Sequence, residues 1–128
     1  MNKIGQIKEK RRFPRLNDRI LIFSKTAESL EPVSDITKNI SSGGLMFETC
    51  RSISPQTIFD LEIYQPLRES TREFISISIL AKVKWVMQIN IPDKYEGSNK
   101  YRIGVEFIEI DDRERKWIAG YVQDKLNA

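Results

Sequence analysis

The stretch "FISISILAKVKWVMQ", residues 74–88, indicates the fold class of this chain. Every odd position from Ile75 to Met87 is apolar, and the even positions include serine, lysine and glutamine. Side chains of a β-strand point alternately to its two faces, so a period of two predicts a half-buried strand. The length fits one long strand or two strands in line with a bend. Trp85 falls on the apolar stripe, where packing on the core or its rim is the expected role and stacking on a ligand is the alternative.

Other parts of the chain have the features of shorter strands, with pieces rich in Gly, Pro, Ser and Asp between them. Many short antiparallel strands at this spacing predict a closed β-barrel, because closure removes exposed sheet edges. Asp35 is then interpreted as a turn or strand-end residue. The strands are expected at 18–25, 44–49, 57–64 and 100–110, and the turns at 28–35, 52–56, 66–71 and 91–99.

The C-terminal residues 111–128 change to a helical period. Asp111 is a candidate N-cap, and Glu114 three residues later completes an arrangement similar to a capping box. We therefore expect one amphipathic helix packed on the barrel. Its apolar stripe comprises Trp117, Ile118, Tyr121, Val122 and Leu126.

The composition excludes several classes of function. The chain has 128 residues, one cysteine (Cys50) and no histidine. A disulfide framework is therefore excluded, Cys50 is expected to be a small buried hydrophobe, and a zinc site or an imidazole base is not expected. No nucleophile-elbow or phosphate-loop spacing is present. We predict no catalytic residue, no metal and no cofactor, and hence a binding protein rather than an enzyme.

Positive charge is concentrated at the N-terminus. Residues 1–15 contain six lysines and arginines and one glutamate, a balance of +5, so the other residues sum to −2 of the total +3. A general nucleic-acid binder usually carries a basic face across its fold, so DNA is not an expected partner. No secretory or membrane-spanning segment is visible, which predicts a cytoplasmic protein without membrane insertion. The expected organisation is a flexible basic arm, 1–8, and one domain, 9–128.

Two short motifs are candidates for a ligand site. The first is Arg11-x-x-x-Arg15 within "RRFPR", immediately before the first expected strand. The second is Asn39-x-Ser41-x-x-Gly44 within "NISSGG", at a strand–turn–strand junction. Each motif alone is weak, but their order and short separation on one barrel make the combination more specific.

At these residues the chain resembles the PilZ domain family, bacterial receptors for the second messenger cyclic di-GMP. The resemblance covers roughly residues 9–122 and includes the late "IGVEF" strand, 103–107. It implies a six-stranded antiparallel β-barrel of the PilZ-like, split-barrel type, with a C-terminal α-helix. It also implies that the arginine arm, the segment that carries Arg11 and Arg15, folds over the ligand. The second motif, on the barrel wall, then holds the other side of the ligand.

The chemistry of these residue types suits that ligand, which carries two phosphodiester charges and two guanines. An arginine guanidinium binds phosphate or a guanine edge with two hydrogen bonds and also stacks on a base. Pro14 disfavours helix at Phe13, which predicts an extended arm. The expected roles are guanine and phosphate contacts for Arg11 and Arg15, with supporting charge from Arg12 and Lys10.

The second motif is expected to line the opposite wall of the site. Asn39 and Ser41 lie two residues apart, so an extended backbone would point both to one face. Gly43 and Gly44 would allow a tight turn and a close approach to the ligand. The family pattern accepts Asp or Asn at the first place, and Asn39 lacks the charged acceptors that Asp would offer to guanine.

The predicted function is a cyclic di-GMP receptor or adaptor that orders its arginine arm on the ligand and relays the signal to a protein partner. One alternative is a PilZ-like protein-interaction domain that no longer binds nucleotide, although the intact motif residues argue against it. The other is a single-stranded nucleic-acid-binding barrel, which would need surface aromatics among basic residues.

Overall fold

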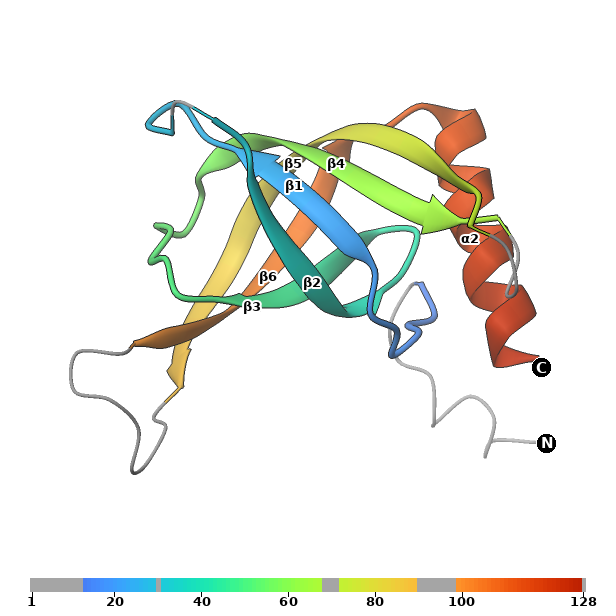
Figure 1. The fold of residues 1–128 in the computed structure, drawn as a ribbon, viewed down its shortest axis with the longest axis horizontal. Helices are drawn as coiled ribbons and strands as arrows, with labels where there is room; N and C mark the ends of the chain where they lie inside the picture. Colours follow the sequence, from blue (N-terminus) through green and yellow to red (C-terminus); the bar gives the residue numbers. More distant parts are fainter. Residues whose placement is uncertain (1–12, 30, 68–71, 90–98, 128) are drawn as a thin grey trace, which may run out of the picture.

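The fold is a closed barrel of six strands with one helix against it, in a computed structural model that describes residues 13–29, 31–67, 72–89 and 99–127. Neighbouring strands are antiparallel throughout, and β1 pairs with both β2 and β4, which closes the barrel in the order β1-β2-β3-β6-β5-β4. The expected fold class is confirmed (Figure 1). The elements are β1 (Leu21–Lys25), β2 (Val33–Ile40), β3 (Gly44–Thr49), β4 (Ile58–Pro66), β5 (Phe74–Ile89), β6 (Lys100–Glu109) and α2 (Asp112–Leu126).

The core fills the inside of the barrel with aliphatic and phenylalanine side chains. Alternation is clearest in β4, where every second residue from Phe59 to Gln65 is buried. Removal of this apolar surface from water drives the closure of the barrel. The buried apolar residues on the strands are Ile22, Ile40, Leu45, Phe47, Phe59, Leu61, Ile63, Ile77, Ile79, Ala81, Val83, Ile103, Val105 and Phe107.

Strand β5 follows the predicted period only as far as Val83. Between Val83 and Trp85 its register against β6 shifts by one residue, because Lys84 is an extra residue on the β5 side. Such a bulge turns the following side chains over to the opposite face. Val86 packs against the core, whereas Trp85 is 38% exposed and Met87 is 52% exposed. The expectation that both lie on the apolar stripe is therefore wrong.

Two further local predictions are wrong. Asp35 lies inside β2, where it is partly buried and forms an ion pair with Arg51 at 2.9 Å. Burial raises the pKa of the Asp35 carboxyl, and the hydrogen bond and charge of Arg51 oppose that shift. Cys50 follows the end of β3 and is exposed, so it is no core residue.

Helix α2 lies across one end of the barrel (Figure 1). Ile118 and Val122 are fully or almost fully buried there, as the helical period predicts, whereas Trp117 and Leu126 of the expected stripe are exposed. Asp111 is in the N-cap position with an extended backbone, but its side chain makes no capping hydrogen bond. The predicted start of the helix is confirmed, and the predicted capping box is not.

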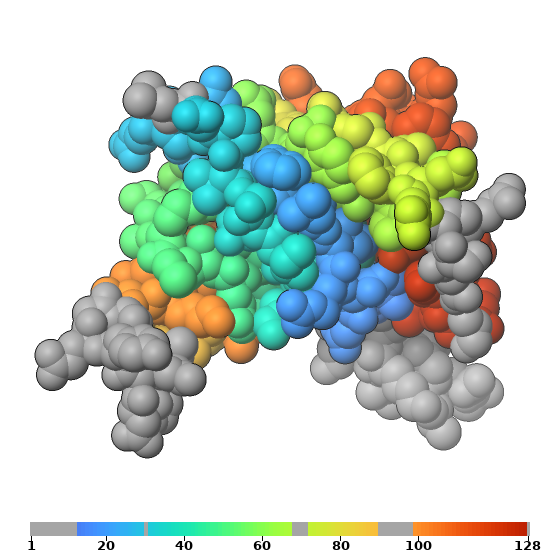
Figure 2. Space-filling model, viewed as in Figure 1, coloured from blue at the N-terminus to red at the C-terminus, as the bar shows by residue number. Residues whose placement is uncertain are grey.

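On one face of the barrel, β1 lies between β2 and β4. Figure 2 shows β1 in blue between the cyan of β2 and the yellow-green of β4. The chain enters β1 from a segment, residues 13–20, that runs past the end of β2. This segment brings Arg15 of the first motif to the second motif.

Candidate functional site

The turn between β2 and β3 is built around the side chain of Ser41, which is 5% exposed. Its hydroxyl accepts hydrogen bonds from the backbone N–H groups of Gly43 (3.1 Å) and Gly44 (3.2 Å) and donates to the Gly44 carbonyl (3.2 Å). The Ser41 N–H also donates to that carbonyl at 2.8 Å. The hydrogen-bonding capacity of the hydroxyl is thus used within the turn, and Ser41 holds its shape.

The segment after the arginine arm is attached to the end of β2. Leu16 and Ile40 form an antiparallel bridge, with N–H to carbonyl distances of 2.8 and 2.9 Å in the two directions. Leu16 is buried at this point, whereas Arg15 is exposed. The bridge places the Arg15 side chain beside the Ser41 turn.

Phe13 anchors the same segment against the turn. Its ring fills the space that a Cβ atom at Gly43 would occupy. The guanidinium of Arg115, from α2, lies 5.6 Å from the centre of the Phe13 ring and donates a 3.0 Å hydrogen bond to the Ser42 carbonyl. We call Phe13, Gly43 and Arg115 the Phe13 clamp.

A cleft of about 440 Å³ opens beside the clamp. It brings residues from both motifs together with the outer face of β3, β5 and β6. A Cβ at Gly44 would collide with the carbonyl oxygen of Val105, so this glycine permits the close pairing of β3 with β6 at the floor of the cleft. The lining residues are Phe13, Arg15, Ser41, Gly43, Gly44, Leu45, Met46, Lys84, Trp85, Gly104, Val105 and Glu106.

One row of paired residues crosses this face of the barrel. Asn39 on β2 is opposite Met46 on β3, Met46 is opposite Gly104 on β6, and Gly104 is opposite Trp85 on β5. The ends of the row are separated by three strand spacings, about 14 Å in all. Asn39 is partly buried at one end and does not line the cleft, whereas Trp85 lines it at the other.

Positive charge is in excess next to this row. Glu48, two residues beyond Met46, accepts two hydrogen bonds from Arg102, at 2.9 and 3.1 Å. Lys38 and Lys100 both lie 3.9 Å from the same carboxylate. Three cations around one carboxylate leave a surplus of two positive charges, which favours an anionic ligand nearby. Lys84 at the cleft pairs with Glu106 at 3.4 Å.

The structure thus brings four of the predicted residues into one cleft, namely Arg15, Ser41, Gly43 and Gly44. Asn39 stays outside the lining. Lys10, Arg11 and Arg12 lie outside the described residues.

Sequence reasoning missed two contributors, Phe13 and Arg115, and for Trp85 it favoured core or rim packing over a place in a ligand site. Phe13 stands within the first motif, so its position was a signal that could have been used. No local pattern marks the other two. Trp85 depends on a bulge, and Arg115 reaches the Ser41 turn from a helix 73 residues away in sequence.

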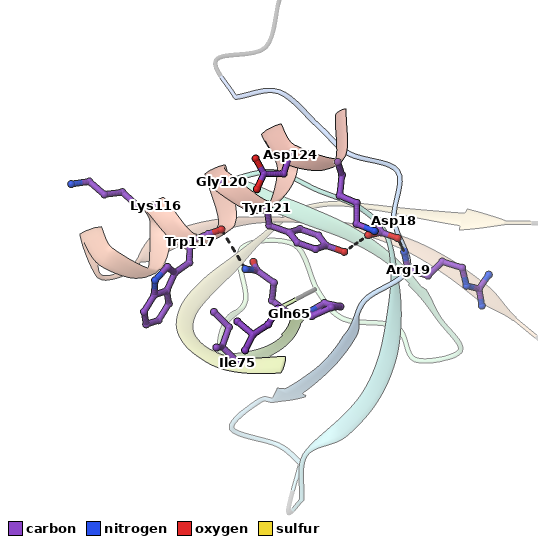
Figure 3. A pocket seen from close by; sticks show the side chains of 12 residues that line it. Asp18, Arg19, Gln65, Ile75, Lys116, Trp117, Gly120, Tyr121 and Asp124 are labelled. Carbon is purple, nitrogen blue, oxygen red and sulfur yellow. Dashed lines mark hydrogen bonds between the residues drawn. The ribbon is translucent and has the colours of Figure 1, made fainter. Parts of the chain in front are cut away.

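A larger cleft, of about 850 Å³, lies between α2 and the ends of β4 and β5 (Figure 3). The Tyr121 hydroxyl donates a short hydrogen bond to the Asp18 carboxylate there, and Gln65 Nε2 donates to the Trp117 carbonyl at 3.3 Å. None of the motif residues that the structure describes lines this cleft. We place the candidate site in the smaller cleft because its chemistry matches both motifs.

In the part of the chain that the structure describes, no three His, Cys, Asp or Glu side chains are grouped to hold a metal ion. Within the same residues, no helix has the length and apolar character needed to cross a bilayer.

Comparison with known proteins points to one family. The sequence matches the model of the PilZ domain over residues 9–124. A search among curated protein sequences found no match.

Solved structures with the same fold include Bacillus subtilis inhibitor of motility, MotI (DgrA), with a TM-score of 0.72 and 20% identity over 93% of this chain and 53% of that one. The PilZ domain of Escherichia coli YcgR with c-di-GMP gives a TM-score of 0.65 and 12% identity over 93% of both chains. The K. pneumonia MrkH–c-di-GMP complex gives 0.63 and 19%, over 93% of this chain and 53% of that one. At such low sequence identity, the structural similarity shows a shared fold alone. The chain spans about half the length of MotI and MrkH.

Proposed function

Because the chain belongs to the PilZ domain family, we propose that it is a receptor for cyclic di-GMP, bound in the cleft between Arg15 and the Ser41 turn. The observation that carries this proposal is the convergence of two motifs. Arg15 precedes β1 and the Ser41 turn follows β2, yet both line one cleft. The solved complexes of YcgR and MrkH with c-di-GMP share this fold, which supports the same ligand class.

The charges and donors at the cleft suit a cyclic dinucleotide. The exposed guanidinium of Arg15 can bind a phosphate or the O6/N7 edge of guanine with two parallel hydrogen bonds. The surplus charge around Glu48 adds a favourable potential for the two phosphodiesters. Ser41 contributes by holding the turn, with the glycine backbone at its tip close to the ligand.

We propose further that the arm before Phe13 closes over the bound ligand. Arg11, Arg12 and Lys10 then supply phosphate and guanine contacts from above, while the Phe13 clamp fixes the point where the arm leaves the barrel. Asn39 supplies a polar contact to the ligand from the far end of the row that carries Met46 and Gly104. Ordering of the arm on the ligand creates a new surface for a protein partner, which is an order–disorder switch.

A partly exposed aromatic cluster favours the alternative of a single-stranded nucleic-acid binder, but the acidic residue beside it argues more strongly against that function. Phe23, Tyr64 and Phe74 form an exposed or partly exposed aromatic cluster, with ring centres 5.4 and 5.2 Å apart. Its polar neighbour is acidic, because Glu62 accepts hydrogen bonds from Tyr64 and Ser76. A strand of phosphates needs a basic track beside its stacking rings.

Calorimetric titration with cyclic di-GMP tests the proposal. We expect saturable binding by the wild type, at least tenfold weaker binding by Arg15→Ala, and no competition from GTP or single-stranded RNA. Arg19→Ala is the matched control, because Arg19 is an exposed arginine four residues further on that lines the other cleft. Absence of binding by the wild type would refute the receptor function.

Hydrogen exchange tests the closing of the arm separately. Ligand should slow amide exchange across residues 8–16 in the wild type and leave β4 unchanged. Binding without any slowing in 8–16 would refute arm closure while leaving the receptor function intact.

A further inference from the structure

We infer that Trp85 is a stacking platform for a guanine base of cyclic di-GMP, an inference that rests on the proposed function. The two sequence motifs do not include this residue. Its role is indicated by the way β5 presents it to the cleft.

The first observation is the bulge in β5. The period of two that holds from Ile75 to Val83 would turn the Trp85 side chain into the barrel. The extra residue, Lys84, reverses this and leaves the indole 38% exposed at the wall of the cleft. The core keeps its packing because Val86 moves against it instead.

The second observation is the residue beneath the indole. Gly104 is the β6 partner of Trp85, and a Cβ at Gly104 would collide with Cε2, Nε1 and Cζ2 of the ring. One face of the indole is therefore supported by the bare backbone of a glycine in a strand. The ring still contributes exposed surface to the cleft that holds Arg15 and the Ser41 turn.

An indole exposed beside cationic and hydrogen-bonding groups is suited to a flat heterocycle. Nucleobases stack on tryptophan with a useful gain in affinity, and guanine offers a large π-face. The other tryptophan provides a contrast within the same chain. Trp117 has nearly equal exposure, 39%, but it lies on α2 at the other cleft with Arg113 5.6 Å from its ring centre.

Fluorescence of Trp117→Phe tests the stacking directly, because Trp85 is then the single tryptophan. Titration with cyclic di-GMP should quench its emission, with a midpoint equal to the calorimetric dissociation constant. Trp85→Phe, which keeps Trp117, should show no quenching over the same range. Quenching in Trp85→Phe but not in Trp117→Phe would overturn the inference.

Calorimetry of four substitutions provides the second test. Trp85→Ala should weaken binding about tenfold or more. Gly104→Ala should also weaken binding, because the added methyl group displaces the indole although Trp85 itself is still present. Trp117→Ala and Gly120→Ala are the controls, and both should bind within about twofold of the wild type; a Cβ at Gly120 meets nothing within 4 Å. Circular dichroism confirms that each variant is folded.

The outcomes separate this inference from the function on which it rests. Wild-type binding that is unchanged in folded Trp85→Ala, together with no quenching in Trp117→Phe, overturns the stacking role and leaves the receptor function standing. Absence of cyclic di-GMP binding by the wild type overturns both.

Discussion

The ring of Phe13 and the backbone of Gly43 are in such close contact that no side chain fits at residue 43. The same ring faces the guanidinium of Arg115, so the start of the described chain, the β2–β3 turn and helix α2 meet at one point. The glycine after Ser42 therefore makes room for part of the protein itself. This contact fixes where the arginine-rich segment meets the barrel.

Substitution of Gly43 by Ala should push the Phe13 ring away from the β2–β3 turn. The added methyl group must displace the Phe13 ring, and we expect about 1–2 kcal/mol lower stability and severalfold weaker cyclic di-GMP binding. Chemical denaturation and calorimetry measure the two effects. In the control Gly120→Ala, a helix glycine with open space gains about 0.5–1 kcal/mol. Equal stability of the Gly43→Ala variant and the wild type would contradict the clamp.

Gly44→Ala should cost more stability than Gly43→Ala. The methyl group would collide with the Val105 carbonyl, and a backbone atom of a barrel strand cannot move aside as a ring can. We expect about 2–3 kcal/mol lower free energy of unfolding, measured by denaturant titration. A smaller loss than in Gly43→Ala would show that β3 and β6 adjust easily here.

Arg115→Ala should loosen the clamp from the side of the helix. It removes the charged hydrogen bond to the Ser42 carbonyl and the contact with the Phe13 ring, and we expect about 1–2 kcal/mol lower stability. Arg113→Ala is a matched control on the same helix, because it removes a ring contact of equal length with Trp117. A double-mutant cycle with Phe13→Leu should show positive coupling for Arg115 only. Additive effects of Arg115→Ala and Phe13→Leu would contradict the contact.

The hydrogen bond between Tyr121 and Asp18 predicts a pH dependence of stability. Burial is the main cause that raises the pKa of the Tyr121 hydroxyl, and the Asp18 hydrogen bond and charge raise it further, from an ordinary value of 10.0. Above pH 10 the unfolded state loses this proton while the folded state keeps it. The stability that the neutral hydroxyl contributes is therefore present below pH 10 and declines as the pH rises further.

Tyr121→Phe isolates that contribution. Between about pH 10 and pH 11 the free energy of unfolding should fall more steeply in the wild type than in Tyr121→Phe, by at most about 1.4 kcal/mol per pH unit. Denaturant titrations at pH 8, 10 and 11 measure the difference. Parallel pH profiles of the two proteins would show that the hydroxyl ionises equally well in both states.

The sequence alone determined the fold class, a closed barrel with one C-terminal helix, because its signals are local, whereas the number of six strands followed from the family resemblance. Alternation from Ile75 to Val83 and from Phe59 to Ile63 depends only on which face of a strand each side chain takes. The helical period around Ile118 and Val122 predicted the buried side of α2 in the same way. The motifs holding Arg15, Ser41, Gly43 and Gly44 also identified residues that line one cleft.

Only the tertiary structure decided which residues from distant parts of the chain come into contact. A bulge depends on the partner strand, so one extra residue in β5 moved Trp85 from the expected apolar stripe to the cleft. Asp35 lies inside β2, where it is opposite Ile22 of β1, and Arg51 from beyond β3 pairs with its carboxylate. Arg115 reaches the Ser42 carbonyl across 73 residues of sequence, a contact that exists only because α2 packs on the barrel. Periodicity determines which face of an element a residue takes, and closure of the barrel determines which distant residues it meets.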